Sequence, residues 1–240
     1  MKRTLRSTVL GLGIAAATPA VLGAELACGA DAPLAGSIRL QYAVTASRSV
    51  LSLAGEGVFE YRRQGDAYEI ESSVTAIGIF EARQSSSGSV HADGLVPRRF
   101  TLQSSRRPPR SIDFDWAAKR VSFSHTGGSE PTRPQMQDRL SLMMQLAWRQ
   151  RREPGASSIE MPVAGPRHAS SYVFRSHGGE AVTVPAGRFE AFKFERRKDD
   201  GDDGLEIWLA PALCSLPVRL RFSDDNGLVI EQRLTAASQL

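Results

Sequence analysis

Three residues are the strongest candidates for acid–base chemistry: Asp113, Asp115 and His125. The two aspartates flank Phe114, so in a β-strand both carboxylates lie on one face. Glycosidase-type hydrolysis needs two carboxyl groups in different environments. Because Phe114 favours the core side, the aspartates are more simply explained as the solvated side of a strand.

His125 begins the segment His125-Thr126-Gly127-Gly128, in which a base would stand beside a glycine-rich loop able to bind an oxyanion. No Gly-x-Ser-x-Gly nucleophile motif accompanies it, so a turn after a strand is the simpler interpretation. An envelope hydrolase that uses His125 or the Asp113/Asp115 pair remains the alternative function.

Metal and cofactor sites are not expected. None of the four histidines has a partner at the spacing of a zinc motif. The acidic segment 199–204 could offer oxygen ligands to calcium, but its glycines break the EF-hand spacing and favour a hairpin tip.

One segment is rich in apolar and methionine side chains, and it predicts a helix over about 138–152. Asp138 can accept the free amide hydrogens of a first turn, and Pro154-Gly155 would end the helix. The apolar residues cover more than half of its circumference, so it must be buried on several sides. They are ordinary core, or they line an adaptable apolar pocket made by Leu140, Met143, Met144, Leu146 and Trp148.

The rest of the chain alternates apolar and polar residues in short runs, as in Ile38 to Val44, bounded by turns such as Gln64-Gly65-Asp66. This pattern predicts a mainly β fold: an antiparallel curved sheet, or a half-closed barrel, of many short strands wrapped around one main helix. We expect a single β-rich domain over 38–240.

The N-terminus has the order of a secretory signal. Three basic residues precede an uncharged run over 8–17, and small residues follow to Ala24. We expect a signal peptide over 1–24, an N-terminal lead over 25–37, and a soluble periplasmic product. No run in the mature chain is long enough for a transmembrane helix.

Export would place Cys28 and Cys214 in an oxidising compartment, where two lone cysteines usually pair. We expect a disulfide between them. The competing interpretation is a lipoprotein anchored through Cys28, but Glu25 and Leu26 match a lipidation signal poorly.

Charge argues against a nucleic-acid partner. Removing the three basic residues of the signal from the formal charge of +4 leaves +1. The densest arginine cluster, over 98–110, lacks the interleaved aromatics of a nucleic-acid surface.

Several ordered motifs resemble one known family. They are Gln137-Asp138-Arg139-Leu140-Ser141, Gly165-Pro166-Arg167, Val184-Pro185-Ala186-Gly187, Ile207-Trp208-Leu209-Ala210-Pro211 and Leu216-Pro217-Val218-Arg219. The chain is similar, over roughly 38–234, to exported proteobacterial proteins grouped as domain of unknown function 3108. The resemblance implies an envelope protein with a β-rich fold and no assigned catalytic residues. A sheet around a helix is also similar to periplasmic lipoprotein carriers, by analogy of fold alone.

Together these features predict a non-catalytic binding or accessory factor of the envelope. Its partner would be a lipid or other apolar ligand held between sheet and helix, or an envelope protein.

Overall fold

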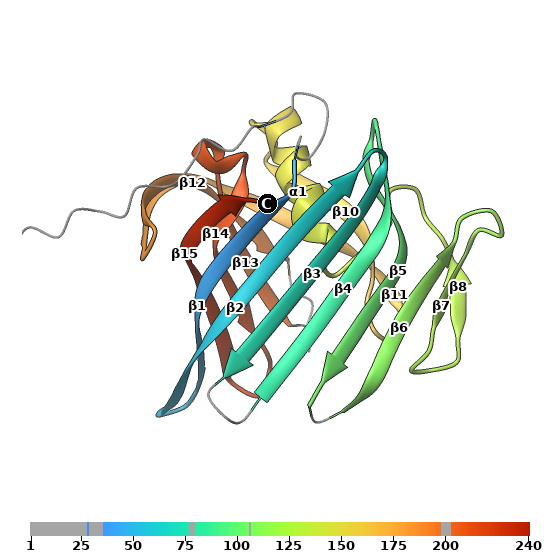
Figure 1. Ribbon diagram of the computed structural model, residues 1–240, viewed down its shortest axis with the longest axis horizontal. Helices are drawn as coiled ribbons and strands as arrows, with labels where there is room; N and C mark the ends of the chain where they lie inside the picture. Colours follow the sequence, from blue (N-terminus) through green and yellow to red (C-terminus); the bar gives the residue numbers. More distant parts are fainter. Residues whose placement is uncertain (1–27, 29–35, 77–79, 106, 198–202) are drawn as a thin grey trace, which may run out of the picture.

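The computed structural model describes residues 28, 36–76, 80–105, 107–197 and 203–240. Within these ranges it contains one sheet, one α-helix and one short 3-10 helix (Figure 1). The helices are α1 (Ser141–Arg152) and η1 (Pro211–Leu213). The strands are β1 (Ile38–Arg48), β2 (Leu51–Gln64), β3 (Ala67–Ala76), β4 (Phe80–His91), β5 (Gly94–Ser104), β6 (Arg107–Asp115), β7 (Arg120–Phe123), β8 (Ser129–Pro131), β9 (Gln137–Asp138), β10 (Ser158–Ala164), β11 (Ala169–Val184), β12 (Gly187–Arg196), β13 (Gly204–Ala210), β14 (Leu216–Ser223) and β15 (Leu228–Gln239).

The 15 described strands follow the order β8-β7-β6-β5-β4-β3-β2-β1-β15-β14-β13-β12-β11-β10-β9. Neighbours in this order are antiparallel, except β9 and β10, which pair in parallel. The first and last long strands, β1 and β15, pair side by side and join the two halves of the sheet. The prediction of a mainly antiparallel, curved sheet around one helix is confirmed.

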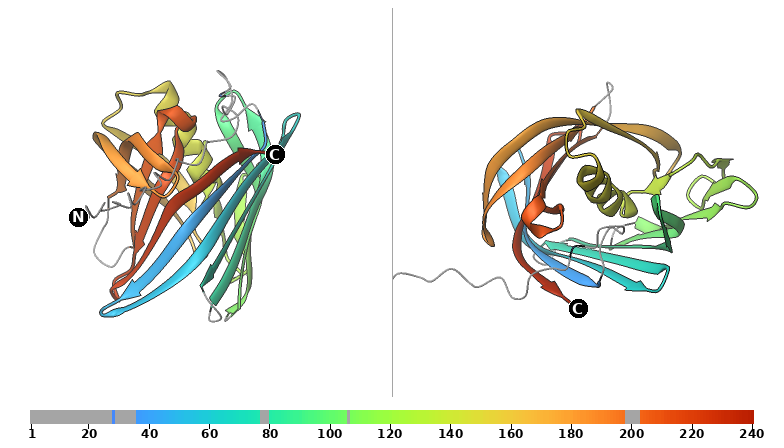
Figure 2. Two further views of the ribbon diagram at one scale, coloured as in Figure 1. Left: turned by 60° about the vertical axis from the view of Figure 1, so that its left-hand side comes forward. Right: turned by 90° about the horizontal axis from the view of Figure 1, so that it is seen from above.

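The sheet curls until β9 approaches β5, so that the strands encircle α1 (Figure 2). At this seam the side-chain nitrogen of Gln137 donates to the carbonyl oxygen of Leu95 at 2.9 Å. A side chain therefore bridges the seam where a strand ladder would otherwise close the barrel. Strands β6 to β8 continue the sheet past the seam and project away from the barrel (Figure 2).

The core occupies the end of the barrel where the β2–β3 and β4–β5 turns lie, which is uppermost in Figure 1. Alternate residues of the strands point inward there because a strand presents every second side chain to one face. These inward residues are almost fully buried against each other and the helix: Leu40, Tyr42, Phe59, Tyr61, Ile70, Leu95, Phe100, Val218 and Leu234.

The helix begins at Ser141, three residues later than predicted, because Gln137 and Asp138 extend beside Val163 and Ala164 as β9. The capping role expected of Asp138 is nevertheless present. Its Oδ1 accepts the amide hydrogens of Leu140 and Ser141, each at 2.8 Å.

Several strands are longer than the sequence predicts. Strand β11 is continuous where the pattern indicates separate strands over 169–175 and 181–184. A register shift between Ser176 and Gly179 absorbs the intervening residues, and Gly178 adopts a φ of +83°, which favours glycine.

A disulfide joins Cys28 to Cys214, with their Cα atoms 5.3 Å apart. Such bonds persist in oxidising, extracytoplasmic compartments. A sulfur in a disulfide carries no lipid thioether, so this bond counts against the lipoprotein alternative. The predicted signal peptide, 1–24, lies outside the described residues. Within the described ranges, no helix is long and apolar enough to cross a membrane.

Candidate functional site

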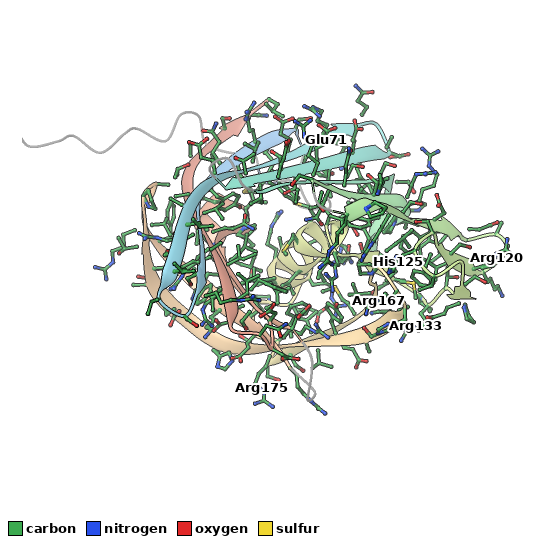
Figure 3. The ribbon with its side chains drawn as sticks, turned by 90° about the horizontal axis from the view of Figure 1, so that it is seen from below. Glu71, Arg120, His125, Arg133, Arg167 and Arg175 are labelled. Carbon is green, nitrogen blue, oxygen red and sulfur yellow. A yellow bond between two sulfur atoms is a disulfide. The ribbon has the colours of Figure 1, made fainter. Side chains whose placement is uncertain are left out.

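A cavity of about 340 Å³ lies inside the barrel, below the first turn of α1. Strands β3 to β5 form one side of the cavity and β11 to β15 the other, and α1 covers its upper end. The apolar lining residues are Val74, Ala82, Leu102, Leu142, Met143, Leu205, Leu220, Phe222 and Ile230. The two walls face each other across the ring, as the positions of Glu71 on one side and Arg175 on the other indicate in Figure 3.

The cavity exists because the helix fills only the upper part of the barrel. In β3 the inward-facing Ile70 is fully buried, whereas Val74, four residues further along the same face, is only half-buried. In β5 the same change occurs between Phe100 and Leu102. The inward apolar faces of the strands thus continue into the lower half, where described side chains do not fill the space between them.

Three charged residues also line the cavity. The side chains of Arg139 and Asp203 are each about 40% exposed, with the guanidinium nitrogen and carboxylate oxygen 3.9 Å apart. Arg196 is only 8% exposed; its guanidinium lies 3.7 Å from the centre of the Tyr172 ring and donates to the carbonyl oxygen of Asp203 at 3.3 Å. Among the described residues, the ionised groups of the lining are thus two guanidinium groups and one carboxylate.

Of the five residues predicted to form an apolar pocket, Met143 lines this cavity. The other four face packed core and are buried: Leu140, Met144, Leu146 and Trp148. Sequence reasoning missed the strand residues that make most of the lining. Their alternation marks them as inward-facing, but it does not distinguish filled from unfilled stretches of the barrel.

The carboxyl group of Asp138 is buried, which the sequence did not predict. Ser86 donates to Asp138 Oδ2 at 2.6 Å, and the Tyr68 hydroxyl lies 3.1 Å from the Ser86 hydroxyl. All three side chains are excluded from solvent. Burial raises the pKa of Asp138, against the opposing effect of its hydrogen bonds to Ser86 and to two backbone amides. This network ties β3 and β4 to the start of the helix.

The residues of the alternative hydrolase lie outside the barrel. The Asp113 side chain is half-exposed and pairs with Arg99 at 3.0 Å. Asp115 accepts the amide hydrogen of Ala118 and stands opposite Arg120 in the ladder; Figure 3 places Arg120 at the edge of the molecule, away from the helix. His125 is exposed in the turn after β7. As the sequence predicts, the Phe114 side chain points to the core, and those of Asp113 and Asp115 lie on the other side of the strand.

The part of the chain that the structure describes contains no group of three or more histidine, cysteine or acidic residues placed to hold a metal ion. Most of the acidic segment considered for calcium, 199–202, lies outside the described residues.

A larger hollow of about 390 Å³ lies on the outer face of β1 to β5. Its lining is mostly polar, and its charged side chains are ion-paired: Arg39 with Glu60 at 3.1 Å, Glu71 with Arg62 at 3.2 Å and Arg83 with Glu81 at 2.7 Å. Such exposed ion pairs are ordinary features of a solvated sheet face. The interior cavity, with apolar side chains left open to solvent, is the stronger candidate site.

Among solved structures, the fold is similar to a beta-barrel-like protein of domain of unknown function DUF1849 from Brucella abortus. The TM-score is 0.57 at 10% identity, over 85% of this chain and 98% of that one. Two others match at TM-scores of 0.30 and 0.27: a DUF1329 family protein from Desulfovibrio piger (6% identity) and a putative outer membrane lipoprotein-sorting protein domain from Vibrio parahaemolyticus (9%), each over 85% of both chains. The first likeness concerns the fold alone, and the other two are too distant to support an argument.

No curated protein matches this sequence. Residues 41–234, most of the chain, match the family described as "Protein of unknown function (DUF3108)". This match covers the strands that form both walls of the cavity, the helix above it and the motifs that suggested the resemblance. The chain belongs to the DUF3108 family.

Proposed function

We propose that this protein is a periplasmic binding factor that holds an apolar ligand in the cavity below α1. The observation that carries the proposal is the lower half of the barrel, which the side chains of the described residues leave unfilled. Apolar side chains from both walls and the helix converge there without covering one another. Protein interiors are normally close-packed, and a concave, mostly apolar space with a few polar groups is the usual form of a small-molecule site.

The cellular location belongs to the same proposal. The order of residues over 1–24 is that of a secretory signal, and the Cys28–Cys214 disulfide needs an oxidising compartment. We infer that the mature protein starts near residue 25, with a short lead to residue 37 and one β-rich domain over 38–240. Mass spectrometry of protein recovered from the periplasm would give the mature N-terminus directly.

The binding proposal is tested with the disulfide-bonded mature protein and the uncharged fluorescent probe N-phenyl-1-naphthylamine. We expect saturable binding at a single site. Ala82→Trp should abolish most of this binding, because Ala82 lines the cavity and an indole would fill the space.

The matched control is Ala236→Trp, which puts the same side chain on an exposed position of β15. It should bind the probe as the wild type does. Native mass spectrometry of wild-type protein from the periplasm should then show a bound molecule that Ala82→Trp lacks. Absence of saturable binding, or equal binding by Ala82→Trp, would refute the proposal.

A further inference from the structure

We infer that the end of the β1–β2 hairpin docks the protein on a lipid bilayer. The side chains of Val50, Leu51 and Leu53 form an apolar tip that enters the boundary between lipid head groups and acyl chains. This inference goes beyond the proposed function, because docking at the tip does not require an occupied cavity.

Exposed apolar side chains gather at this hairpin. Four large apolar side chains of the described residues are exposed: Val50 (97%), Leu51 (74%), Leu53 (44%) and Leu240 (54%). Single exposed apolar residues are normal on a protein surface, whereas contiguous ones mark interaction sites. Three of the four belong to one hairpin, which reaches the lower end of the barrel (Figure 1).

The turn itself contains a residue type that turns disfavour. Ser49 and Val50 form the two-residue loop between β1 and β2, and Ser49 takes the positive φ, +53°, that such loops use at their first position. In the β2–β3 turn at the upper end, Gly65 and Asp66 occupy the same two places. A branched apolar residue suits a turn poorly, and Val50 gains no burial in return. Such a departure from local preference is expected where a residue serves function rather than folding.

The apolar tip continues the inward face of the sheet beyond the cavity. In the two ladders of β1, Ala46 stands between Ile230 of β15 and Leu53 of β2. Directly opposed residues share one face of a sheet, and so do residues two apart on one strand. Ile230 lines the cavity and is half-buried, Leu53 is exposed, and Leu51, closer to the turn, is more exposed again. A row of apolar side chains therefore leads from the cavity to the tip, and docking brings the lower half of the barrel to the lipid surface.

The size and shape of the apolar tip favour a bilayer over a folded protein. Three aliphatic side chains expose on the order of a few hundred Å². This is well below the area of about 800 Å² that each partner contributes to a standard protein interface. A hairpin end is convex and needs no matching pocket to enter a bilayer boundary, where apolar side chains reach a depth of about 5–10 Å. Ser49 and Ser52, which are exposed beside the tip, suit the polar head-group layer.

The first test measures flotation of the disulfide-bonded mature protein with phosphatidylcholine vesicles. This lipid has no net charge, so binding reports apolar contact rather than electrostatic attraction. We expect reversible binding that is half-maximal on the order of 1 mM lipid, since three side chains bury less apolar surface than one acyl chain. The double variant Val50→Ser with Leu51→Ser should bind about tenfold more weakly.

Leu240→Ser is the matched control. It makes the same kind of change at an exposed position beside the upper end of β15 and should leave flotation unchanged. Because the substituted side chains are exposed, the double variant should keep the melting temperature of the wild type.

A second test locates the tip in the bilayer. Val50→Trp should strengthen flotation, because tryptophan favours the membrane interface. Vesicles with brominated acyl chains should quench the fluorescence that this tryptophan adds to that of the wild type. Asp66→Trp puts the same side chain in the exposed β2–β3 turn at the opposite end, and these vesicles should leave its added fluorescence unchanged.

The outcomes distinguish this inference from the proposed function. Without vesicles, the double variant should bind N-phenyl-1-naphthylamine as the wild type does, and Ala82→Trp should float with vesicles as the wild type does. If the wild type floats but does not bind the probe, the proposed function is wrong while docking stands.

Docking is wrong, and the cavity site stands, if the wild type does not float at about 10 mM lipid or if the double variant floats equally well. Analytical ultracentrifugation tests the rival partner, a second copy of this chain. A dimer that the double variant abolishes would show that another copy covers the tip, and it would overturn the inference.

Discussion

The side chain of Gln145, on the helix, accepts the backbone amide hydrogen of Leu95 at 2.9 Å, inside the barrel. Its side-chain nitrogen donates to the carbonyl oxygen of Asp93 at 3.0 Å. The side-chain amide of Gln145 therefore holds the β4–β5 turn against the helix through two hydrogen bonds. Because that amide is buried, loss of either partner would leave a polar atom without water or protein to bond to.

Gly94 lies between these two backbone groups, and because it has no Cβ atom it leaves room for the Gln145 side chain. It has a φ of +112°, and a Cβ atom there would lie 2.1 Å from the Gln145 side-chain oxygen. We expect Gly94→Ala to lower the free energy of unfolding by about 2–4 kcal/mol, since backbone strain adds to a disrupted hydrogen bond. Urea denaturation measures this loss.

Gly65→Ala is the control for backbone strain alone. Gly65 also has a positive φ, of +58°, but nothing lies within 4 Å of the position of its Cβ. We expect it to cost only about 1 kcal/mol. Equal costs at the two glycines would show that the contact with Gln145 adds nothing to the stability of the fold.

The buried Asp138 makes stability depend on pH. Its pKa in the folded protein lies above its ordinary value of 3.8, chiefly because burial disfavours the charged form. Between these two values the folded protein holds a proton that the unfolded chain has released, so the free energy of unfolding falls as the pH rises. This contribution is complete below the unfolded pKa and is lost as the pH rises through the folded pKa.

Urea denaturation of the wild type and Asp138→Asn between pH 4 and pH 8 measures this effect. We expect the wild type to lose stability relative to the variant as the pH rises from 4, and the difference to level off above the folded pKa. A difference that stays constant with pH, or that changes in the opposite direction, would contradict the assignment.

The sequence predicted the sheet and the helix because both depend on local periodicity. Alternation identified β1 and β14, and continuous apolar residues identified α1 as a buried helix. The burial of Asp138 was not predictable in this way, since it arises where β9, far along the chain, meets Ser86 of β4. The cavity was only partly predictable. Met143 was singled out by its type, but the lining also depends on how far the helix reaches into the barrel.

The Cys28–Cys214 disulfide ties the N-terminal lead to the residue after η1. The loop that the disulfide closes contains almost the whole domain. For a loop this long, the chain-entropy model allows up to about 5 kcal/mol of stabilisation. We expect Cys28→Ser with Cys214→Ala to lower the free energy of unfolding by about 2–4 kcal/mol. In urea denaturation with dithiothreitol present, the free energy of unfolding should fall for the wild type and stay unchanged for the double variant.

Two leucines on the inward face of the sheet distinguish the filled and unfilled parts of the barrel. Leu40 is fully buried in the upper core, whereas Leu220 lines the cavity and is only half-buried. Without added ligand, Leu40→Ala should cost about 2–5 kcal/mol, and Leu220→Ala should cost clearly less, because water already reaches its side chain. Saturating N-phenyl-1-naphthylamine stabilises the folded protein by mass action and covers Leu220. The thermal shift that ligand gives should therefore be reduced in Leu220→Ala and retained in Leu40→Ala. If ligand shifts the melting temperature of both variants equally, it binds outside the cavity.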